Sequence, residues 1–434
     1  MLKVCKFGGT SMASSKMFMK VKDIVLSDDL RKVVVCSAAG KRDNNDSKIT
    51  DLLYILHAHL KYNVPYEDIW NNIKNRFIEI RNDLNIDLEI EKELDLIHSK
   101  LNKNMKEEYL ISRGEYLTSM LFAKYIGFEF VDATKLFIFS FDGALAEKKT
   151  EENIKNALNN YKNIVVPGFY GAYVNDDIRL FSRGGSDISG AYLARYLNAS
   201  VYENWTDVSG ILAADPKIVS NPKIIQEITY QELRELSYMG ANVLHEETIF
   251  PVMQMNIPIN LKNTNKPEDS GTIIKNNIDN PKDFILGLAG KNNFMTFNIF
   301  KSHMSNEIGF LRKTLSIFEK YNVSVEHIPS GIDSFSVVVL KDNAFKFQYE
   351  IISEIKNELG AEVVVDDDLA LISIVGRNIK GKLGYSGEIF KSLGNEKINV
   401  KLIALGPLEL SLIVGVNKDN YLNAIKTLYN GLIK

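Results

Sequence analysis

Residues 2–11, LKVCKFGGTS, determine the architecture of the first half of the chain. An apolar-rich strand ends in two glycines and two hydroxyl residues, and apolar residues at helical spacing follow as far as Val25. The next apolar run, residues 33–36 (VVVC), is continuous, as is typical of a strand buried on both faces. Strand, helix and strand in this order form a βαβ unit, the signature of a parallel sheet covered by helices.

The same alternation continues to about residue 275, so we predict an α/β catalytic domain over residues 1–280. A polar loop near 41–48 precedes a mostly helical stretch from Thr50 to about Tyr125. We expect a further helix to begin at Ser186-Asp187, which are good N-cap residues. Further strands are expected near 129–131, 136–141, 164–167, 200–203 and 257–261.

An internal repeat occupies residues 284–434. Each copy has the order strand, helix, strand, strand, helix, which is ferredoxin-like. We predict a first module at about 292–367 and a second at about 368–434. The second lacks a strand, and residues 284–290 could supply it. The first module would then be inserted into the second.

Composition excludes several classes of protein. The 434 residues are 45% hydrophobic and 25% charged, as in ordinary globular proteins, and the formal net charge of −3 provides no basic surface for nucleic acid. Cys5 and Cys36 lie in apolar runs and read as free thiols of a core, not as a disulfide framework. With no signal-peptide pattern and no run of about 18 apolar residues, we expect a cytoplasmic protein that binds no membrane.

Two glycine turns could bind anions. In the first, Lys6 precedes Gly8 and Gly9, where free backbone N–H groups at a strand-to-helix turn can face phosphate. The P-loop pattern is absent, and an ordinary turn is an equally good interpretation. In the second, residues 181–190 (FSRGGSDISG), Arg183 offers a planar fork for a carboxylate. Two such turns, one with Lys and one with Arg, favour a pair of anionic substrates.

Three further motifs follow predicted strands or begin predicted helices. Residues 204–217 combine NWTDVSG with ADPK in a polar loop, and the alternative is a plain Asp-Pro turn. In residues 112–115 (SRGE) the carboxylate of Glu115 would sit at the start of a helix, so capping is the alternative. Residues 37–40 (SAAG), together with Thr50, could hold a substrate carboxylate or cap a helix. The six histidines have no metal-ligand spacing.

Taken together, these motifs resemble the aspartokinases within the amino acid kinase family. The resemblance covers nearly the whole chain, through KFGGTS, RGE, FSRGGSD, TDV-x-G, DPK and GA-x-VLH, and ends in a pair of ACT modules. It implies an αβα sandwich of three layers with a mostly parallel sheet, followed by two ferredoxin-like regulatory modules. The implied reaction transfers the γ-phosphate of MgATP to the β-carboxylate of L-aspartate, giving 4-phospho-L-aspartate.

The resemblance also implies residue roles. Lys6 would contact the transferring phosphate, Glu115 the α-ammonium of aspartate and Arg183 its α-carboxylate. Asp187 would organise Mg²⁺ and Lys6. The full implied set comprises catalytic Lys6 and Asp187, substrate-binding Ser37, Thr50, Glu115, Arg183 and Ser186, and ATP-binding Lys6, Gly8, Gly9, Ser11, Thr206, Asp207 and Lys217.

For the regulatory third, the resemblance implies an amino-acid effector bound between modules, with lysine the first choice and threonine the second. Glu326 could pair with a lysine ammonium or be a solvated strand residue. Self-association through these modules would give a homodimer or homotetramer. The alternatives are another member of the kinase family, acting on glutamate, carbamate or UMP, and a catalytically weak amino-acid sensor. The matching effector positions are Met304, Glu307, Gly309, Phe310, Leu311, Glu326 and Ser330.

The chain departs from the family's pattern at Leu212, at Lys217, at Asn242, where relatives have a nucleotide-binding lysine, and at Glu246, where they have proline. We expect Asn242 to weaken ATP binding without abolishing activity. The Asn242→Lys variant should therefore have a lower KM for ATP in steady-state assays. An unchanged KM would contradict this interpretation.

Overall fold

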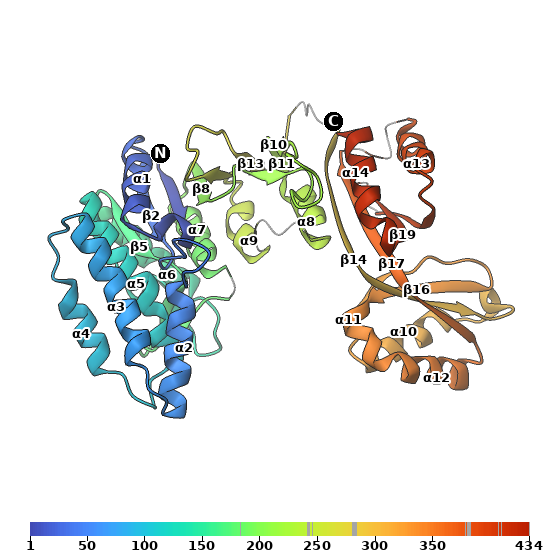
Figure 1. The fold of residues 1–434 in the computed structure, drawn as a ribbon, viewed down its shortest axis with the longest axis horizontal. Helices are drawn as coiled ribbons and strands as arrows, with labels where there is room; N and C mark the ends of the chain where they lie inside the picture. Colours follow the sequence, from blue (N-terminus) through green and yellow to red (C-terminus); the bar gives the residue numbers. More distant parts are fainter. Residues whose placement is uncertain are drawn as a thin grey trace. The chain divides into compact units, whose positions relative to one another are not determined.

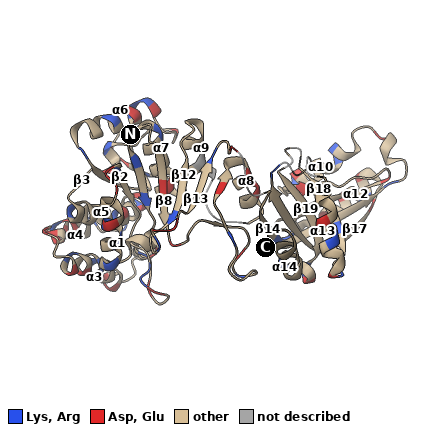
Figure 2. Cartoon of the chain, turned by 90° about the horizontal axis from the view of Figure 1, so that it is seen from above, with Lys and Arg blue, Asp and Glu red and all other residues tan. Residues whose placement is uncertain are grey.

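The computed structural model describes residues 1–434 except 183, 241–243, 245, 280–283, 378, 380–382, 407, 409 and 434, and except the side chains of 246, 247 and 249. The chain divides into two compact units (Figure 1). The first contains residues 1–211, 226–230 and 243–278, and the second contains 212–225, 231–242 and 279–434. Figure 2 shows acidic and basic residues intermingled over both units, in keeping with the small net charge.

A mostly parallel sheet forms the centre of the first unit. Over the described residues its order is β11-β13-β12-β8-β1-β2-β5-β3, and only the pair β12–β13 is antiparallel. The strands are β1 (Lys3–Phe7), β2 (Arg31–Cys36), β3 (Glu129–Phe130), β5 (Ile164–Pro167), β8 (Val201–Thr206), β11 (Glu227–Thr229), β12 (Ile259–Asn263) and β13 (Thr272–Lys275). A smaller sheet joins β4 (Ile138–Phe139), β6 (Tyr170–Tyr173) and β7 (Ile178–Leu180).

Helices cover both faces of the large sheet. On one face, Cys5 and Phe7 of β1 share an apolar core with α1 (Ser15–Leu26), α2 (Ile49–Tyr62), α3 (Glu67–Asp83), α4 (Ile90–Ser99) and α5 (Glu107–Ile126). Because side chains alternate along a strand, Lys6 points to the other face, where α7 (Gly185–Tyr196) lies. Beside α7 pack α6 (Glu147–Asn160) and α9 (Glu246–Gln254). The unit is therefore a sandwich of three layers.

One antiparallel sheet runs through the second unit. Its order is β15-β16-β14-β17-β19-β18. The strands are β14 (Ile285–Phe300), β15 (Val325–His327), β16 (Ser334–Leu340), β17 (Glu362–Gly376), β18 (Val400–Leu405) and β19 (Ser411–Asn417). The helices of this unit include α10 (Phe310–Lys320), α11 (Lys341–Ala344), α12 (Gln348–Leu359), α13 (Tyr385–Asn395) and α14 (Tyr421–Leu432).

The two central strands of this sheet belong to both modules. Residues 294–300 of β14 pair with residues 362–369 of β17 in the first module. Residues 285–291 of β14 pair with residues 371–376 of β17, which in turn pair with β19 in the second. This is the pairing that an inserted first module requires.

Two segments that precede residue 280 pack within the second unit. In the first, the N–H of Leu288 donates to the carbonyl of Ala213 (2.7 Å), and the hydroxyl of Tyr429 accepts from the N–H of Lys223 (2.8 Å). The second segment includes most of α8 (Tyr230–Tyr238), whose residue Glu232 pairs with Arg377 (2.9 Å). The boundary between the units in space therefore differs from a single division of the sequence at residue 280.

Two further short strands, β9 (Ile211–Leu212) and β10 (Ile224–Ile225), form a two-stranded ribbon. Over the described ranges, we find no helix with the length and apolar composition needed to cross a bilayer.

Candidate active site

Four strands of the large sheet end at the same level. Phe7 of β1 is in register with Cys36 of β2 and with Trp205 of β8, and Cys36 is in register with Pro167 of β5. The loops that follow carry most of the motifs singled out from the sequence. In α/β sheets, ligands bind at the carboxyl ends of the strands, so this edge is the candidate site.

An ion pair lies at this edge. Lys6 Nζ is 2.6 Å from Asp187 Oδ1, and their side chains are only 10% and 17% exposed. The expectation that Ser186 and Asp187 begin α7 as caps is wrong. The N-cap is Gly184, whose φ of 78° is left-handed and favours glycine, and no side chain caps the helix among the described residues. The Asp187 carboxylate is therefore available to Lys6.

Two contacts from β8 reach Asp187, and sequence reasoning missed both. Asn204 Nδ2 donates to Asp187 Oδ1 (2.9 Å), and the hydroxyl of Tyr202 donates to the backbone carbonyl of Asp187 (3.0 Å). The strand expected near 200–203 extends to Thr206 in the structure, so Asn204, which the sequence analysis placed in the following loop, is a polar residue within a central strand, where apolar side chains are the rule.

The glycine turn after β1 packs backbone against backbone on the loop after β2. The N–H of Gly40 donates to the carbonyl of Gly9 (2.8 Å). A Cβ atom on Gly40 would lie 2.5 Å from the carbonyl carbon of Gly9, so this approach requires glycine. The hydroxyl of Ser11 is 2.7 Å from that of Thr264, which follows β12 and was also missed from the sequence. The turn is thus held from two sides.

Glu115 is a buried carboxylate that forms no ion pair with the residues that the structure describes. It lies in the middle of α5, which begins at Glu107, so the expectation of a residue at a helix start is wrong. The side chain is 5% exposed, and Oε2 has no hydrogen-bond partner among the described residues. Burial raises the pKa of Glu115 to about 8, although the backbone N–H of Ala38 partly opposes this shift. Such a group is suited to receive a ligand's ammonium.

The other predicted site residues of the first unit lie in the same loops or in adjacent helices. Ser37 is half-buried, and its N–H donates to the carbonyl of Phe7 (3.1 Å). Thr50 lies in the first turn of α2 and Ser186 in that of α7. Thr206 donates to the exposed Asp207 (3.2 Å).

Four predicted or divergent positions lie outside the described residues, in full or by their side chain, or belong to the second unit. Arg183 and Asn242 lie outside the described residues, as does the side chain of Glu246. Lys217 belongs to the second unit, where its side chain is exposed and its N–H donates to Asp215 (2.8 Å).

Several predicted effector residues lie close together around the start of α10. Glu307 accepts hydrogen bonds from Lys301 (2.5 Å) and Lys313 (3.2 Å), and these bonds lower its pKa. Gly309 is the N-cap of α10, with φ of 78°, and Met304 lies in the preceding 3-10 turn.

The other effector positions lie in the first turn of α10 and in the strand segments near it. The ring of Phe310 packs edge-on against Phe335 (5.9 Å), and Phe335 forms a bridge with Ser330. Leu311 is exposed at 42%. Glu326 accepts a hydrogen bond from the hydroxyl of Tyr238 of α8, so it is not simply a solvated strand residue.

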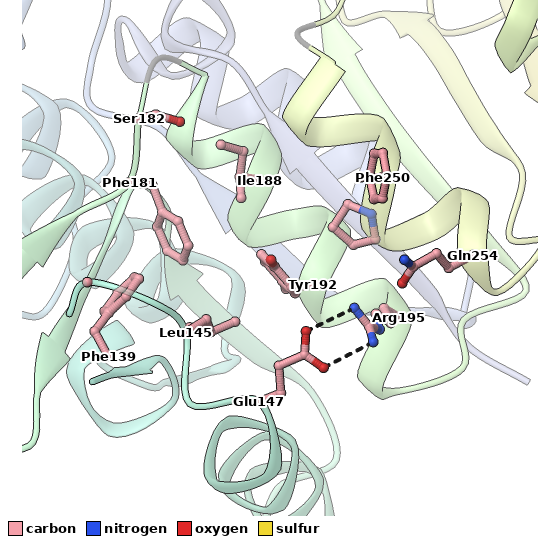
Figure 3. A pocket seen from close by; sticks show the side chains of 12 residues that line it. Phe139, Leu145, Glu147, Phe181, Ser182, Ile188, Tyr192, Arg195, Phe250 and Gln254 are labelled. Carbon is pink, nitrogen blue, oxygen red and sulfur yellow. Dashed lines mark hydrogen bonds and ion pairs between the residues drawn. The ribbon is translucent and has the colours of Figure 1, made fainter. Parts of the chain in front are cut away.

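A hollow of about 550 Å³ lies on the outer side of α7 (Figure 3). Ile188, Tyr192 and Arg195, at helical spacing, line it from α7, and aromatic rings from neighbouring elements complete its walls. The ion pair of Arg195 with Glu147 (3.2 Å) closes one end. None of the predicted site residues that the structure describes lines this hollow, so it is distinct from the candidate site.

Metal binding by the protein alone is not indicated. The described residues include no group of three or more His, Cys, Asp or Glu that could hold a metal ion. Mg²⁺, however, is usually held by one or two carboxylates together with substrate phosphates. Asp187 fits that pattern, because it lies beside the glycine turn.

Comparison with known proteins agrees with this architecture. The model of the amino acid kinase family matches residues 1–263, and that of an ACT domain matches residues 372–432. Aspartokinase 3 of Bacillus subtilis is 35% identical, and the alignment covers 99% of this chain and 98% of the relative. The chain belongs to the aspartokinases of the amino acid kinase family.

Solved structures of aspartokinases match over almost the whole chain. The crystal structure of Clostridium acetobutylicum aspartate kinase is 44% identical, with a TM-score of 0.91 and coverage of 99% of both chains. Escherichia coli aspartokinase III with aspartate and ADP, an R-state, is 26% identical, with a TM-score of 0.74. The T-state complex of the same enzyme with lysine and aspartate is 27% identical, with a TM-score of 0.76. Both alignments cover 100% of each chain. The fold is the amino acid kinase fold with C-terminal ACT modules.

The buried carboxyl of Glu115 should make stability depend on pH. Its pKa is about 8 in the folded state against an ordinary value of 4.5, so the folded state holds a proton that the unfolded chain loses. Stability should therefore fall as pH rises from 4.5 to 8, by at most about 1.4 kcal/mol per pH unit. Glu115→Gln should lack this fall, as measured by thermal unfolding midpoints between these pH values.

The exposed residue Glu108 on the same helix provides the control for this comparison. Glu108→Gln should follow the wild-type pH profile. Identical profiles for wild type and Glu115→Gln would show that Glu115 is not held protonated.

Proposed function

We propose that this chain transfers the γ-phosphate of ATP to the β-carboxylate of L-aspartate and is regulated by an end-product amino acid. The observation that carries the proposal is the Lys6–Asp187 pair at 2.6 Å, beside a glycine turn at the carboxyl edge of the sheet. Glu115, buried and with no partner for Oε2 among the residues described, adds a counterion for an amino acid. The E. coli relative crystallised with aspartate and ADP supports the same two substrates.

The chemistry requires positioning more than proton transfer. A β-carboxylate has an ordinary pKa of about 3.9 and is already ionised at neutral pH, so no general base is needed. The difficulty is to bring two anions together in line. In this proposal Lys6 contacts and neutralises the transferring phosphate, and Gly8, Gly9 and Ser11 frame its path. The N–H of Gly8 donates to the carbonyl of Trp205 (3.0 Å), so Gly8 contributes its close approach and not a free donor.

The aspartate would be held at both ends of its backbone. Glu115 would accept its α-ammonium, and that cation would favour the ionised form of the carboxyl. Arg183, assisted by Thr50, would bind the α-carboxylate. Ser37 and Ser186 lie in the adjoining loops and would complete the site.

The nucleotide would occupy the neighbouring side of the edge. Thr206, Asp207 and Lys217 are the proposed contacts to ATP. Mg²⁺ would be carried by the phosphates and held, directly or through water, by Asp187, and it would supply neutralisation of phosphate charge.

Regulation is assigned to the ACT modules. We infer that lysine is the effector and threonine the second choice, and the E. coli relative crystallised with lysine supports this. Its proposed contacts are those around the start of α10, with Glu326 for the ε-ammonium. Self-association through the modules would give a homodimer or homotetramer. Two free buried cysteines fit a cytoplasmic enzyme, and the product would enter lysine, threonine and methionine biosynthesis.

Loss of the Lys6 ammonium should abolish most of the activity. Lys6→Ala should lower kcat by about two orders of magnitude or more, equivalent to about 3 kcal/mol of transition-state stabilisation. Trapping of the acyl phosphate with hydroxylamine, with aspartate and with glutamate as acceptor, measures this. Lys3→Ala, on the opposite face of the same strand, is the control and should keep near-normal turnover. Near-normal turnover of Lys6→Ala would refute the role.

Lysine should inhibit the wild-type enzyme in the same assay. Glu326→Gln should raise the half-inhibitory lysine concentration about tenfold, since a charged hydrogen bond contributes about 1.5 kcal/mol or more. Threonine is titrated in parallel. Insensitivity to both amino acids would leave the modules as dimerisation units.

A further inference from the structure

Strand β8 presents two residues to the same face of the sheet as Lys6. Asn204 is the register partner of Lys6 on the adjacent parallel strand, and Tyr202 lies two residues earlier. Glu203 and Trp205 point to the opposite face, where Glu203 pairs with Arg31 (2.8 Å). Because the alternate residues are anchored in this way, the orientation of Tyr202 and Asn204 is fixed by the strand.

Tyr202 and Asn204 support one residue at two points. The Tyr202 hydroxyl donates to the backbone carbonyl of Asp187 (3.0 Å), and Asn204 Nδ2 donates to its carboxylate Oδ1 (2.9 Å). That same oxygen lies 2.6 Å from Lys6 Nζ. Tyr202 is fully buried and Asn204 is 2% exposed. A Cβ on Gly190 would lie 2.7 Å from the Tyr202 hydroxyl, so α7 rests closely on this ring.

The two hydrogen bonds fix the orientation of the Asp187 carboxylate, which the ion pair with Lys6 alone would leave free to rotate. The terminal torsion of an aspartate side chain is broad, so a carboxylate bound only to a lysine can rotate. The lysine ammonium sits on a flexible stem, so its position follows the oxygen to which it is bound. A neutral amide on that oxygen fixes the carboxylate without adding a charge that would compete with Lys6.

We propose that Tyr202 and Asn204 are positioning residues that hold Asp187, and through it the Lys6 ammonium, in the geometry for phosphoryl transfer. Neither needs to contact a substrate. The inference rests on the proposed roles of Lys6 and Asp187 and adds the residues that set their geometry.

The test is steady-state kinetics of the full-length enzyme with aspartate and MgATP. Asn204→Leu keeps the branched heavy-atom skeleton of the side chain and lacks the donor, and it should lower kcat about 10- to 100-fold, since displacement of a reacting group by about 1 Å can cost that much. The KM for aspartate should stay within about twofold, because its proposed contacts lie elsewhere. Asn204→Asp should be worse, since it sets a second carboxylate against Asp187. Tyr202→Phe should show a smaller loss of kcat.

A double-mutant cycle separates positioning from general stability. If Asn204 acts through Asp187, the effect of Asn204→Leu should disappear in an Asp187→Asn background. Thr150→Val is the matched control, since it also removes a buried side-chain hydrogen bond, the one Thr150 Oγ1 accepts from the N–H of Ile138 (3.1 Å). It should lower the unfolding midpoint with kcat unchanged. Tyr202→Phe removes a single oxygen and keeps the test available if Asn204→Leu does not fold.

Three outcomes would overturn the inference. The first is a normal kcat of Asn204→Leu in an enzyme that Lys6→Ala inactivates. The second is a loss of kcat in Asn204→Leu that Thr150→Val matches at an equal fall in midpoint. The third is a full, additive effect of Asn204→Leu in the Asp187→Asn background. Normal turnover of Lys6→Ala would instead refute the proposed function on which this inference rests.

Discussion

The level ends of β1, β2, β5 and β8 are the constraint on which the candidate site depends. Since the four strands stop in register, four loops leave the sheet at one edge. Loops that leave together must pack against one another, which explains why Gly40 has no room for a side chain beside Gly9. A shift of one residue in β1 would move Lys6 to the other face and separate it from Asp187.

Charge at this edge is arranged in two ways. Lys6 and Asp187 neutralise each other, so neither is a buried lone charge. Glu115 has no such partner within the described part of the chain, and its raised pKa makes the neutral acid its resting form at neutral pH. Each arrangement avoids an unpaired charge before ligands arrive. Substrate charges would then take over the neutralising role of the ion pair at Lys6 and of the bound proton at Glu115.

Local sequence predicted the elements and the turns, and long-range geometry decided the rest. The strand–turn–helix around Lys6 was readable because glycine and hydroxyl residues follow an apolar run. Glu115 was misplaced at a helix start, because Gly114 looks like a break although it packs tightly on Ala38 within α5. Asn204 could not be assigned, since its partner Asp187 is 17 residues away and only the strand register brings them together.

The shared strands of the regulatory unit have a mechanical consequence. At about 3.3 Å per residue, β14 and β17 each span about 50 Å. Both modules therefore share one pair of continuous strands, with no linker between them. The pairing of β14 with β17 is irregular between Lys291 and Thr296, where the register shifts. Bulges of this kind bend a strand locally. A twist that begins in one module would therefore reach the other through this irregular segment, as a change in the curvature of the two shared strands.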